Sequence, residues 1–155
     1  MHIALIEPEI PPNTGNITRT CVMTGTTLHL VGKLGFSLAD RHLRRAGLDY
    51  WPYLVFYTYR DFESLYRFYQ HNGCNFYFFT TKAQKAYTEA TYKIDDFLVF
   101  GRETAGLSPE FLARWPERCL RIPMKAGLPR SLNLSNAVAI VLYEALRQQG
   151  YPGLQ

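Results

Sequence analysis

Residues 121–146, RIPMKAGLPRSLNLSNAVAIVLYEAL, join a short apolar segment to a long apolar helical segment through a stretch rich in Gly, Pro, Ser and Asn. A loop between two buried elements carries backbone N–H and C=O groups that must find hydrogen-bond partners. One helix N-cap needs only one short polar side chain, whereas this stretch offers several. The surplus indicates that the loop backbone is satisfied either by these side chains or by a bound ligand.

Short apolar segments recur along the chain with helical or loop stretches between them. They are residues 2–7, 27–32, 53–59, 75–81, 96–101 and 119–124. Because these are nearly continuous hydrophobic runs and not strict alternations, they predict a mainly parallel sheet covered on both faces. No linker, repeat or low-complexity tract divides the 155 residues. The sequence therefore predicts a single α/β domain over 1–155.

Helix signals lie between these segments. The first predicted helix has Asn13 or Thr14 as N-cap and ends at Gly25. Others are predicted from residue 61, from Ser108, and over 136–149 with Ser135 as N-cap. The last helix is apolar almost all round over 137–142, so its second side must be covered. The cover is either another part of the chain or a second subunit.

Composition restricts the possible partners. The formal net charge of +4 and the pI of about 9.0 permit a polyanionic partner without requiring one. No apolar run approaches a membrane span and the N-terminus lacks signal-peptide features, so we expect a cytoplasmic protein. Cys21, Cys74 and Cys119 form no close pair, which fits a reducing compartment. The four histidines lack zinc-site spacing, so no metal is expected.

A basic cluster stands at Arg41, Arg44 and Arg45, next to His42. Most such clusters are solvated helix faces. The alternative is a patch that binds RNA phosphates. The sequence alone does not choose between these two readings.

The common phosphate-binding and nucleophile motifs are absent, which leaves three loops, each placed at the end of a predicted strand. They are EPEIPPNTGNITR (7–19), FGRETAGL (100–107) and the segment that starts at residue 121. In an open α/β sheet, ligands bind beyond the carboxyl ends of the strands. The three loops are therefore candidates for one shared site.

Three stretches of this chain resemble the motifs of the SPOUT class of RNA methyltransferases. They are NTGNITR (13–19), FGRETAGL (100–107) and RIPMKAGLPRSLNLSNAVAIVLYEA (121–145). The nearest likeness is to the small tRNA 2′-O-methyltransferases that act on the wobble nucleotide. It extends to LRRAGLDY (43–50), TTK (80–82) and YEALRQQGYPG (143–153), and so covers nearly the whole chain. Arg102 stands where the family usually has Pro, and Leu132 where it usually has Met.

The resemblance implies a C-terminal trefoil knot that holds S-adenosylmethionine, a homodimer, and tRNA as substrate. Chain periodicity does not indicate a knot, and general topology rules disfavour one. The implied catalytic residues are Asn13, Arg19, Glu103, Ser131 and Asn133. The implied cofactor-binding residues are Phe79, Thr80, Gly101, Ile122, Met124 and Ser131. The implied RNA-binding residues are Arg41, Arg44 and Arg45.

Family accounts let the arginine at position 19 take the proton of the ribose 2′-hydroxyl. A guanidinium has a pKa above ~12 and is normally a fixed cation. We therefore favour Arg19 as a phosphate clamp that also stabilises the developing alkoxide.

Two other functions compete with this reading. A nucleotide-binding oxidoreductase would need a Gly-rich first turn, which EPEIPPNTGN does not supply. A catalytically silent RNA-binding module would need only the basic cluster and the many aromatic residues. The presence of all three cofactor loops makes the silent module the weaker reading.

Overall fold

The computed structural model describes residues 1–39 and 50–155, in which six strands form one sheet. The strands are β1 (His2–Ile6), β2 (Thr27–Val31), β3 (Phe56–Tyr59), β4 (Phe76–Phe79), β5 (Phe97–Phe100) and β6 (Cys119–Leu120). Their order is β3-β2-β1-β5-β4-β6, and each of the five neighbouring pairs is parallel. The predicted mainly parallel sheet is confirmed.

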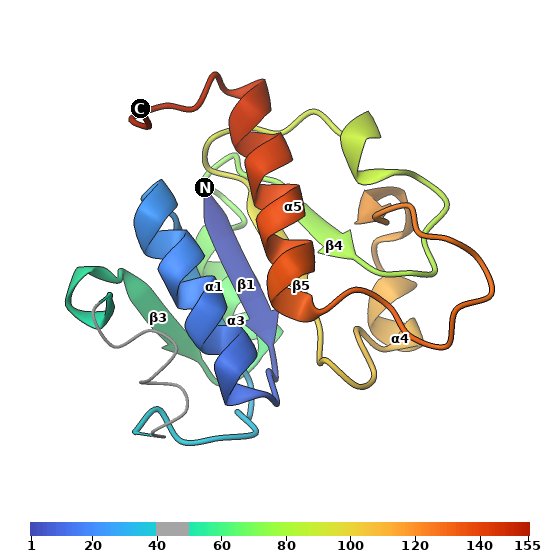
Figure 1. Cartoon of the computed structure of the whole chain (residues 1–155), viewed down its shortest axis with the longest axis horizontal. Coiled ribbons are helices and arrows are strands. Elements are labelled where there is room, and N and C mark those ends of the chain that lie inside the picture. Colours follow the sequence, from blue (N-terminus) through green and yellow to red (C-terminus); the bar gives the residue numbers. More distant parts are fainter. Residues whose placement is uncertain (40–49) are drawn as a thin grey trace.

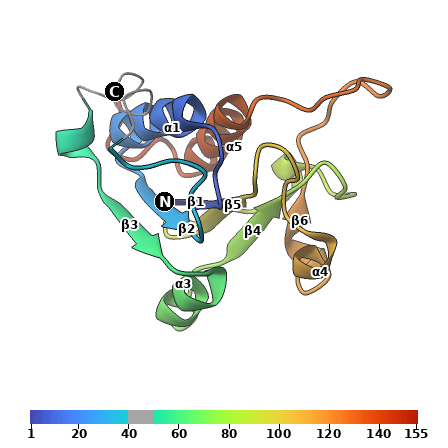
Figure 2. The ribbon, with the colours of Figure 1, turned by 90° about the horizontal axis from the view of Figure 1, so that it is seen from below.

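Helices cover both faces of the sheet (Figures 1 and 2). On one face lie α1 (Pro11–Thr24) and α5 (Leu134–Gln148), and on the other lie α3 (Phe62–Tyr69) and α4 (Pro109–Leu112). Short 3₁₀ helices occur at Trp51–Tyr53, Tyr87–Glu89 and Pro116–Arg118. This three-layer arrangement confirms the predicted α/β class.

Successive side chains of a strand point to opposite faces of the sheet, so the core has two layers. Ile3 and Leu5 of β1 pack in the cluster that includes α1 and α5, whereas Ala4 packs in the cluster that includes α3. All three side chains are fully buried. Because both faces of the central strands are covered, their sequences are continuous apolar runs.

Each strand is shorter than its apolar run, and for β3 and β6 the structure shows the reason. The run over 53–59 becomes a strand only at Phe56, because Trp51–Tyr53 form a 3₁₀ turn. The run over 119–124 is strand only at Cys119–Leu120. Arg121 makes a single bridge to Ala86, and the chain then leaves the sheet. Hydrophobicity alone did not reveal that residues 122–124 line a cavity instead of extending the strand.

Two predicted N-caps were wrong. Helix α1 begins at Pro11 with Ile10 as N-cap, because proline at the first helical positions has a preset φ and lacks an N–H that would need a partner. Helix α5 begins at Leu134, and its N-cap is Asn133, whose side chain accepts a hydrogen bond from the Ser135 N–H at 2.9 Å.

Two other predicted helix ends are confirmed. Gly25 ends α1 with a left-handed φ of 62°, and Ser108 caps α4 by accepting a hydrogen bond from the Phe111 N–H at 3.2 Å. Among the described residues, no helix combines the length and apolar character needed to span a membrane.

The apolar helix α5 is covered mainly by its own chain. Val138, Val141 and Leu142 are fully buried in the core, and α5 packs against α1 and β5. On its outer side, Ile140 is 38% exposed and Tyr143 is 46% exposed. An apolar strip of α5 therefore remains open to a further partner.

Candidate functional site

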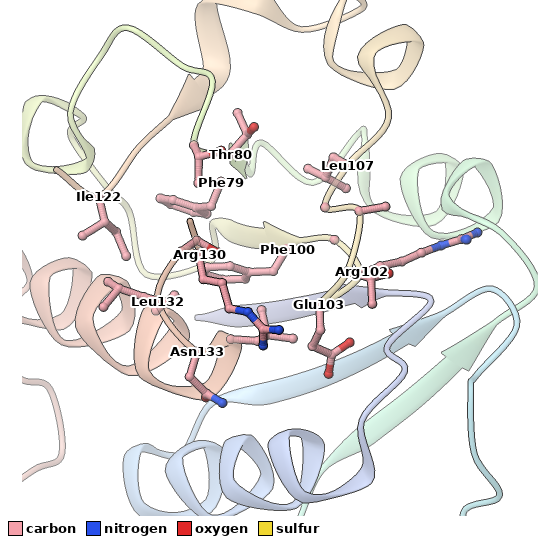
Figure 3. Close-up of a pocket in the computed structure, with 18 of the residues that line it drawn as sticks. Phe79, Thr80, Phe100, Arg102, Glu103, Leu107, Ile122, Arg130, Leu132 and Asn133 are labelled. Atoms are coloured by element: carbon pink, nitrogen blue, oxygen red, sulfur yellow. The ribbon is translucent and has the colours of Figure 1, made fainter. Parts of the chain in front are cut away.

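A cavity of about 670 Å³ opens beyond the carboxyl ends of β4 and β5 (Figure 3). The loop that follows β6 and the first turn of α5 close its other side. Of the residues predicted for the site, those that line this cavity are Asn13, Phe79, Thr80, Gly101, Glu103, Ile122, Met124, Ser131 and Asn133. The structure thus brings together three loops that lie far apart in the sequence.

One wall of the cavity is apolar. The Phe79 and Phe100 rings stack with centroids 4.8 Å apart, and Ile122 and Leu132 extend from the opposite segment (Figure 3). Leu107 adds to the wall from the loop after β5. Cavities of about 300–1,000 Å³ with mostly apolar walls and a few polar groups are typical of small-molecule sites.

Backbone groups beside this wall have no backbone partner in the described part of the chain. In residues 1–39 and 50–155, no backbone–backbone hydrogen bond involves Ile122, Pro123 or Met124. A polar backbone group shielded from water without a partner is costly, so such groups normally bind water or a ligand. Ile122 and Met124 line the cavity and are partly exposed, so their backbone groups are open to water or to a bound ligand.

Gly101 permits a tight loop after β5. A Cβ at this position would lie 2.3 Å from the Gly106 carbonyl carbon and 2.4 Å from the Leu107 nitrogen. The loop closes through a hydrogen bond of 2.9 Å from the Gly106 N–H to the Arg102 carbonyl. Any side chain at residue 101 would force the cavity wall apart.

Glu103 ties the loop after β5 to the start of α1. Its carboxylate accepts hydrogen bonds from the Glu9 N–H at 2.8 Å, the Ile10 N–H at 3.2 Å and the Asn13 side-chain amide at 3.2 Å. A carboxylate can accept several hydrogen bonds at once, and these three N–H donors come from two adjoining segments of the chain, the loop after β1 and helix α1. Glu103 therefore acts as a fixed anchor and not as a solvated turn residue.

The hydrogen bonds of Glu103 and Asn13 extend to the third loop, which follows β6. The Asn13 side-chain oxygen accepts a hydrogen bond of 2.9 Å from the Asn133 amide, whose own oxygen accepts from the Ser135 N–H and hydroxyl. Because each end of this network is fixed by groups of known polarity, both amides have one possible orientation. We call Glu103, Asn13 and Asn133 the motif network.

Arg19 lies away from the cavity. It projects from the exposed side of α1, and its guanidinium carbon is 4.8 Å from the centroid of the Tyr50 ring, in the geometry of a cation–π contact. The structure of one chain therefore separates Arg19 from the other predicted catalytic residues. Arg41, Arg44 and Arg45 lie outside the described residues.

Several cavity residues were not assigned from the sequence. They include Ile10, Lys82, Phe100, Arg102, Leu107, Arg130 and Leu132. Phe100, Arg102 and Leu107 belong to the second motif and could have been assigned from their place in it. Lys82 and Arg130 give the cavity mouth two cations. Among the described residues, no group of three or more His, Cys, Asp or Glu could hold a metal ion.

Known proteins share the sequence of this chain over nearly its whole length. The model of the SpoU rRNA Methylase family matches residues 1–143. A protein of Geobacillus stearothermophilus is 51% identical over 160 residues, with 99% of this chain and 98% of the relative covered. The tRNA (cytidine(34)-2′-O)-methyltransferase of Burkholderia pseudomallei is 44% identical, with 98% of this chain and 97% of the relative covered.

Solved structures agree with the sequence relatives. A structure that concerns the 2-OH methylation of C/U34 on tRNA has a TM-score of 0.89 and 42% identity, and covers 96% of this chain and 95% of that one. An AdoMet-bound rRNA methyltransferase from Sinorhizobium meliloti has a TM-score of 0.82 and 29% identity, and covers 94% of this chain and 55% of that one. The three cavity loops and these matches together establish that the chain belongs to the SpoU rRNA methylase family.

Proposed function

We propose that this protein transfers a methyl group from S-adenosylmethionine to the ribose 2′-hydroxyl of the wobble nucleotide, C34 or U34, of tRNA. The observation that carries the proposal is the cavity in which three distant loops meet through the motif network. Relatives similar over nearly their whole length are named for this reaction.

The cavity fits S-adenosylmethionine in chemistry and in size. Phe79, Phe100 and Ile122 offer an apolar wall to a flat base, and Thr80 and Ser131 offer hydroxyl groups. The unpaired backbone around Ile122 and Met124 can satisfy a polar ligand edge. When bound, this cofactor supplies an electrophilic methyl group on a sulfonium.

Methyl transfer needs the acceptor oxygen to be placed in line, with help for the loss of its proton. The motif network holds the start of α1, the loop after β5 and the start of α5 at fixed positions around the cavity. Ser131 and Asn133 would hold the nucleotide or the cofactor. Arg19 would clamp a phosphate and stabilise the developing alkoxide.

We further propose that the chain acts as a homodimer, because Arg19 does not line the cavity of its own chain. On α1, Arg19 and Met23 are four residues apart and share one exposed side, and Met23 is 54% exposed. Helix α5 packs beside α1 and exposes Ile140 and Tyr143. A second chain that covers these apolar residues would also meet Arg19, and each Arg19 could then serve the partner's cavity.

The trefoil knot and the cytoplasmic location belong to the same proposal. After β5 the chain forms β6 at the far edge of the sheet and returns to α5, which packs against β5. Such a return path is compatible with threading through the segment around the cavity. The three cysteines are free thiols, as expected in a reducing compartment.

The substrate would meet a basic surface around the cavity mouth. Lys82, Arg102 and Arg130 line the cavity within the described chain. Together with Arg41, Arg44 and Arg45, they would neutralise phosphates of the tRNA, which makes binding depend on salt.

The test is mass spectrometry of tRNA nucleosides from a strain that lacks this protein. Loss of 2′-O-methylcytidine or 2′-O-methyluridine at the wobble position, restored by the wild-type protein, supports the proposal. A modification profile that does not change contradicts it.

A catalytically silent RNA-binding module is the second candidate, favoured by the position of Arg19 outside the cavity of one chain. Calorimetry with S-adenosylmethionine and S-adenosylhomocysteine separates the two candidates. The enzyme binds both ligands, whereas a silent module with no donor site binds neither.

A further inference from the structure

A second recess, of about 170 Å³, opens next to the donor cavity at the carboxyl ends of β1 and β2. It is lined by Glu7, Glu9, Lys33, Leu34, Gly35 and Arg102. Arg102 lines both the recess and the donor cavity, so the two spaces share one wall. In an open parallel sheet, this edge is where ligands bind.

Two glycines allow the walls of the recess to meet. Gly32 has a φ of 81°, and a Cβ at this residue would lie 2.7 Å from the Glu7 Cγ. A Cβ at Gly35 would lie 2.7 Å from the Glu9 Cα, and the Gly35 N–H donates a hydrogen bond of 2.9 Å to the Pro8 carbonyl. Gly32 therefore leaves room for the Glu7 side chain, and Gly35 lets the loops after β1 and β2 pack backbone against backbone.

Glu7 occupies an unusual backbone conformation at the start of this recess. Its φ is 49°, in the left-handed region that residues other than glycine seldom adopt. Such strain persists only where the surroundings enforce it, and it concentrates at functional sites. The Glu7 carboxylate forms an ion pair with Arg102, whose side chain runs away from Phe79 and Ile122 (Figure 3).

The recess combines hydrogen-bond acceptors and donors around an apolar residue. The carboxylates of Glu7 and Glu9 accept hydrogen bonds, Lys33 and Arg102 donate them, and Leu34 offers an apolar surface. Cytosine and uracil match this set, because each has an N–H on its pairing edge and a carbonyl oxygen at O2. The volume lies below the ~300–1,000 Å³ of sites for drug-sized ligands, so one ring fits but a whole nucleotide does not.

We propose that this recess binds the pyrimidine base of the nucleotide that is methylated, with Glu7 accepting from the base N–H and Lys33 donating to O2. The inference rests on the proposed function, since it places the ribose of the same nucleotide at the shared wall near Arg102. Base selection is then separated from donor binding: the recess selects the base and the larger cavity holds the donor.

The test uses anticodon stem-loop RNAs that differ only in the wobble base, which is uridine, 3-methyluridine, cytidine or N4,N4-dimethylcytidine. Initial rates are measured for the wild type, Glu7→Ala and Lys33→Ala, with Glu63→Ala as control. Glu63 lies on α3 and pairs with Arg114 on another surface. Binding of S-adenosylhomocysteine is measured by calorimetry for each variant.

The methylated bases lack the N–H, so 3-methyluridine is compared with uridine and N4,N4-dimethylcytidine with cytidine. In the wild type, methylation of the base should lower kcat/KM about tenfold or more, as expected for a lost hydrogen bond to a charged group. We call this fold-change the penalty. In Glu7→Ala this penalty should fall to about twofold, because the acceptor is gone. Lys33→Ala should lower activity on uridine and cytidine while it keeps the penalty. Glu63→Ala should match the wild type, and all variants should bind S-adenosylhomocysteine equally.

The subsite is overturned if the penalty is equally large in the wild type and in Glu7→Ala. It is also overturned if the wild type methylates all four RNAs at the same rate. Both results leave the proposed function intact. A wild type that methylates none of the four RNAs overturns the proposed function and the subsite with it. If Glu7→Ala is inactive on every RNA, Glu7→Gly replaces it, because glycine removes the acceptor and tolerates the left-handed φ of residue 7, and an undiminished penalty in that variant overturns the subsite.

Discussion

Two polar clusters lie at opposite ends of the strands, and they differ in what surrounds them. At the carboxyl ends, the motif network of Glu103, Asn13 and Asn133 borders an open cavity. Near the amino ends, the His2 Nδ1 lies 3.0 Å from the His29 Nε2, among aromatic rings. Each cluster contains one buried polar side chain, Asn13 in the first and His29 in the second, but only the first connects loops to a space that a ligand can enter.

The histidine pair shows what a structural polar cluster looks like. The His2 ring stacks on Phe97 with centroids 4.4 Å apart, and Tyr69 lies against both imidazoles. Burial lowers the pKa of His2 to about 4 and that of His29 to about 3, so both are neutral near pH 7. Burial and a shifted pKa are therefore poor guides to function here, whereas access to a cavity at the strand ends is a good one.

The largest expected effect is that of replacing Arg19, and it tests whether Arg19 completes the site that the motif network borders. Arg19→Ala should lower kcat about a thousandfold, because a charge-stabilising group is lost. If Arg19 serves the partner's cavity, mixing Arg19→Ala with Asn133→Ala protomers should restore up to about a quarter of the wild-type activity. Each variant alone should remain inactive. Mixtures that stay inactive after subunit exchange would show that Arg19 and Asn133 serve a site from the same chain, or that one of them does not serve it.

The chemistry of Arg19 can be separated from its position. A clamp needs the planar guanidinium, so Arg19→Lys should lose most activity at every pH. A Lys variant whose rate climbs steeply with pH would show that proton removal limits the reaction. Rates are compared with saturating donor, and RNA binding is measured separately.

Breaking the motif network should have the next largest effect. Gln at position 103 would turn an NH₂ group toward one of the three N–H donors that Glu103 now satisfies. Glu103→Gln should therefore lower the free energy of unfolding by about 1–3 kcal/mol and kcat/KM about a hundredfold. Urea unfolding and initial-rate kinetics measure the two losses. Glu63→Gln, in an exposed ion pair, should change neither by more than a small amount.

Much of this fold could be predicted from the sequence, for a physical reason. A parallel sheet with both faces covered requires continuous apolar strands, and all six were found from that pattern. Helix starts were harder, because Asn13, Thr14 and Ser135 are all good N-cap residues on composition. Asn13 and Asn133 could not be assigned to one network, since their contact joins positions 120 residues apart in the sequence.

The site was predicted unevenly. Most of the residues assigned from the three motifs line the cavity, because each motif marks a loop at the end of a strand. The place of Arg19 could not be predicted, since only the three-dimensional arrangement shows that its side of α1 faces away from the cavity. Val141 belongs to the apolar run 137–142 that either the chain or a second subunit could cover, and the structure shows it fully buried in the core of its own chain. Ile140→Glu is the better test of a dimer, and should yield folded monomers in sedimentation experiments.

The smallest expected effect concerns the histidine pair. The folded-state pKa values of His2 and His29 lie below the ordinary 6.5, so the unfolded state takes up protons first as pH falls. The stability contributed by the neutral pair is full above about pH 6.5 and is lost progressively down to about pH 3, the folded-state pKa of His29. The Tm at pH 5 should be about 5 °C below that at pH 7.5. His29→Phe should flatten this dependence and leave activity at pH 7.5 unchanged; an equally steep decline would assign the loss to other groups.

The most direct measurement is transfer of labelled methyl groups from S-adenosylmethionine to two anticodon stem-loop RNAs. The RNAs are identical except that the wobble nucleotide carries a 2′-hydroxyl in one and a 2′-hydrogen in the other. We expect the wild-type protein to label only the RNA with the hydroxyl, and the Glu103→Gln variant to label it about a hundredfold more slowly. Equal labelling of both RNAs by the wild type would show that the methyl group goes elsewhere and would contradict the proposed 2′-O-methyl transfer.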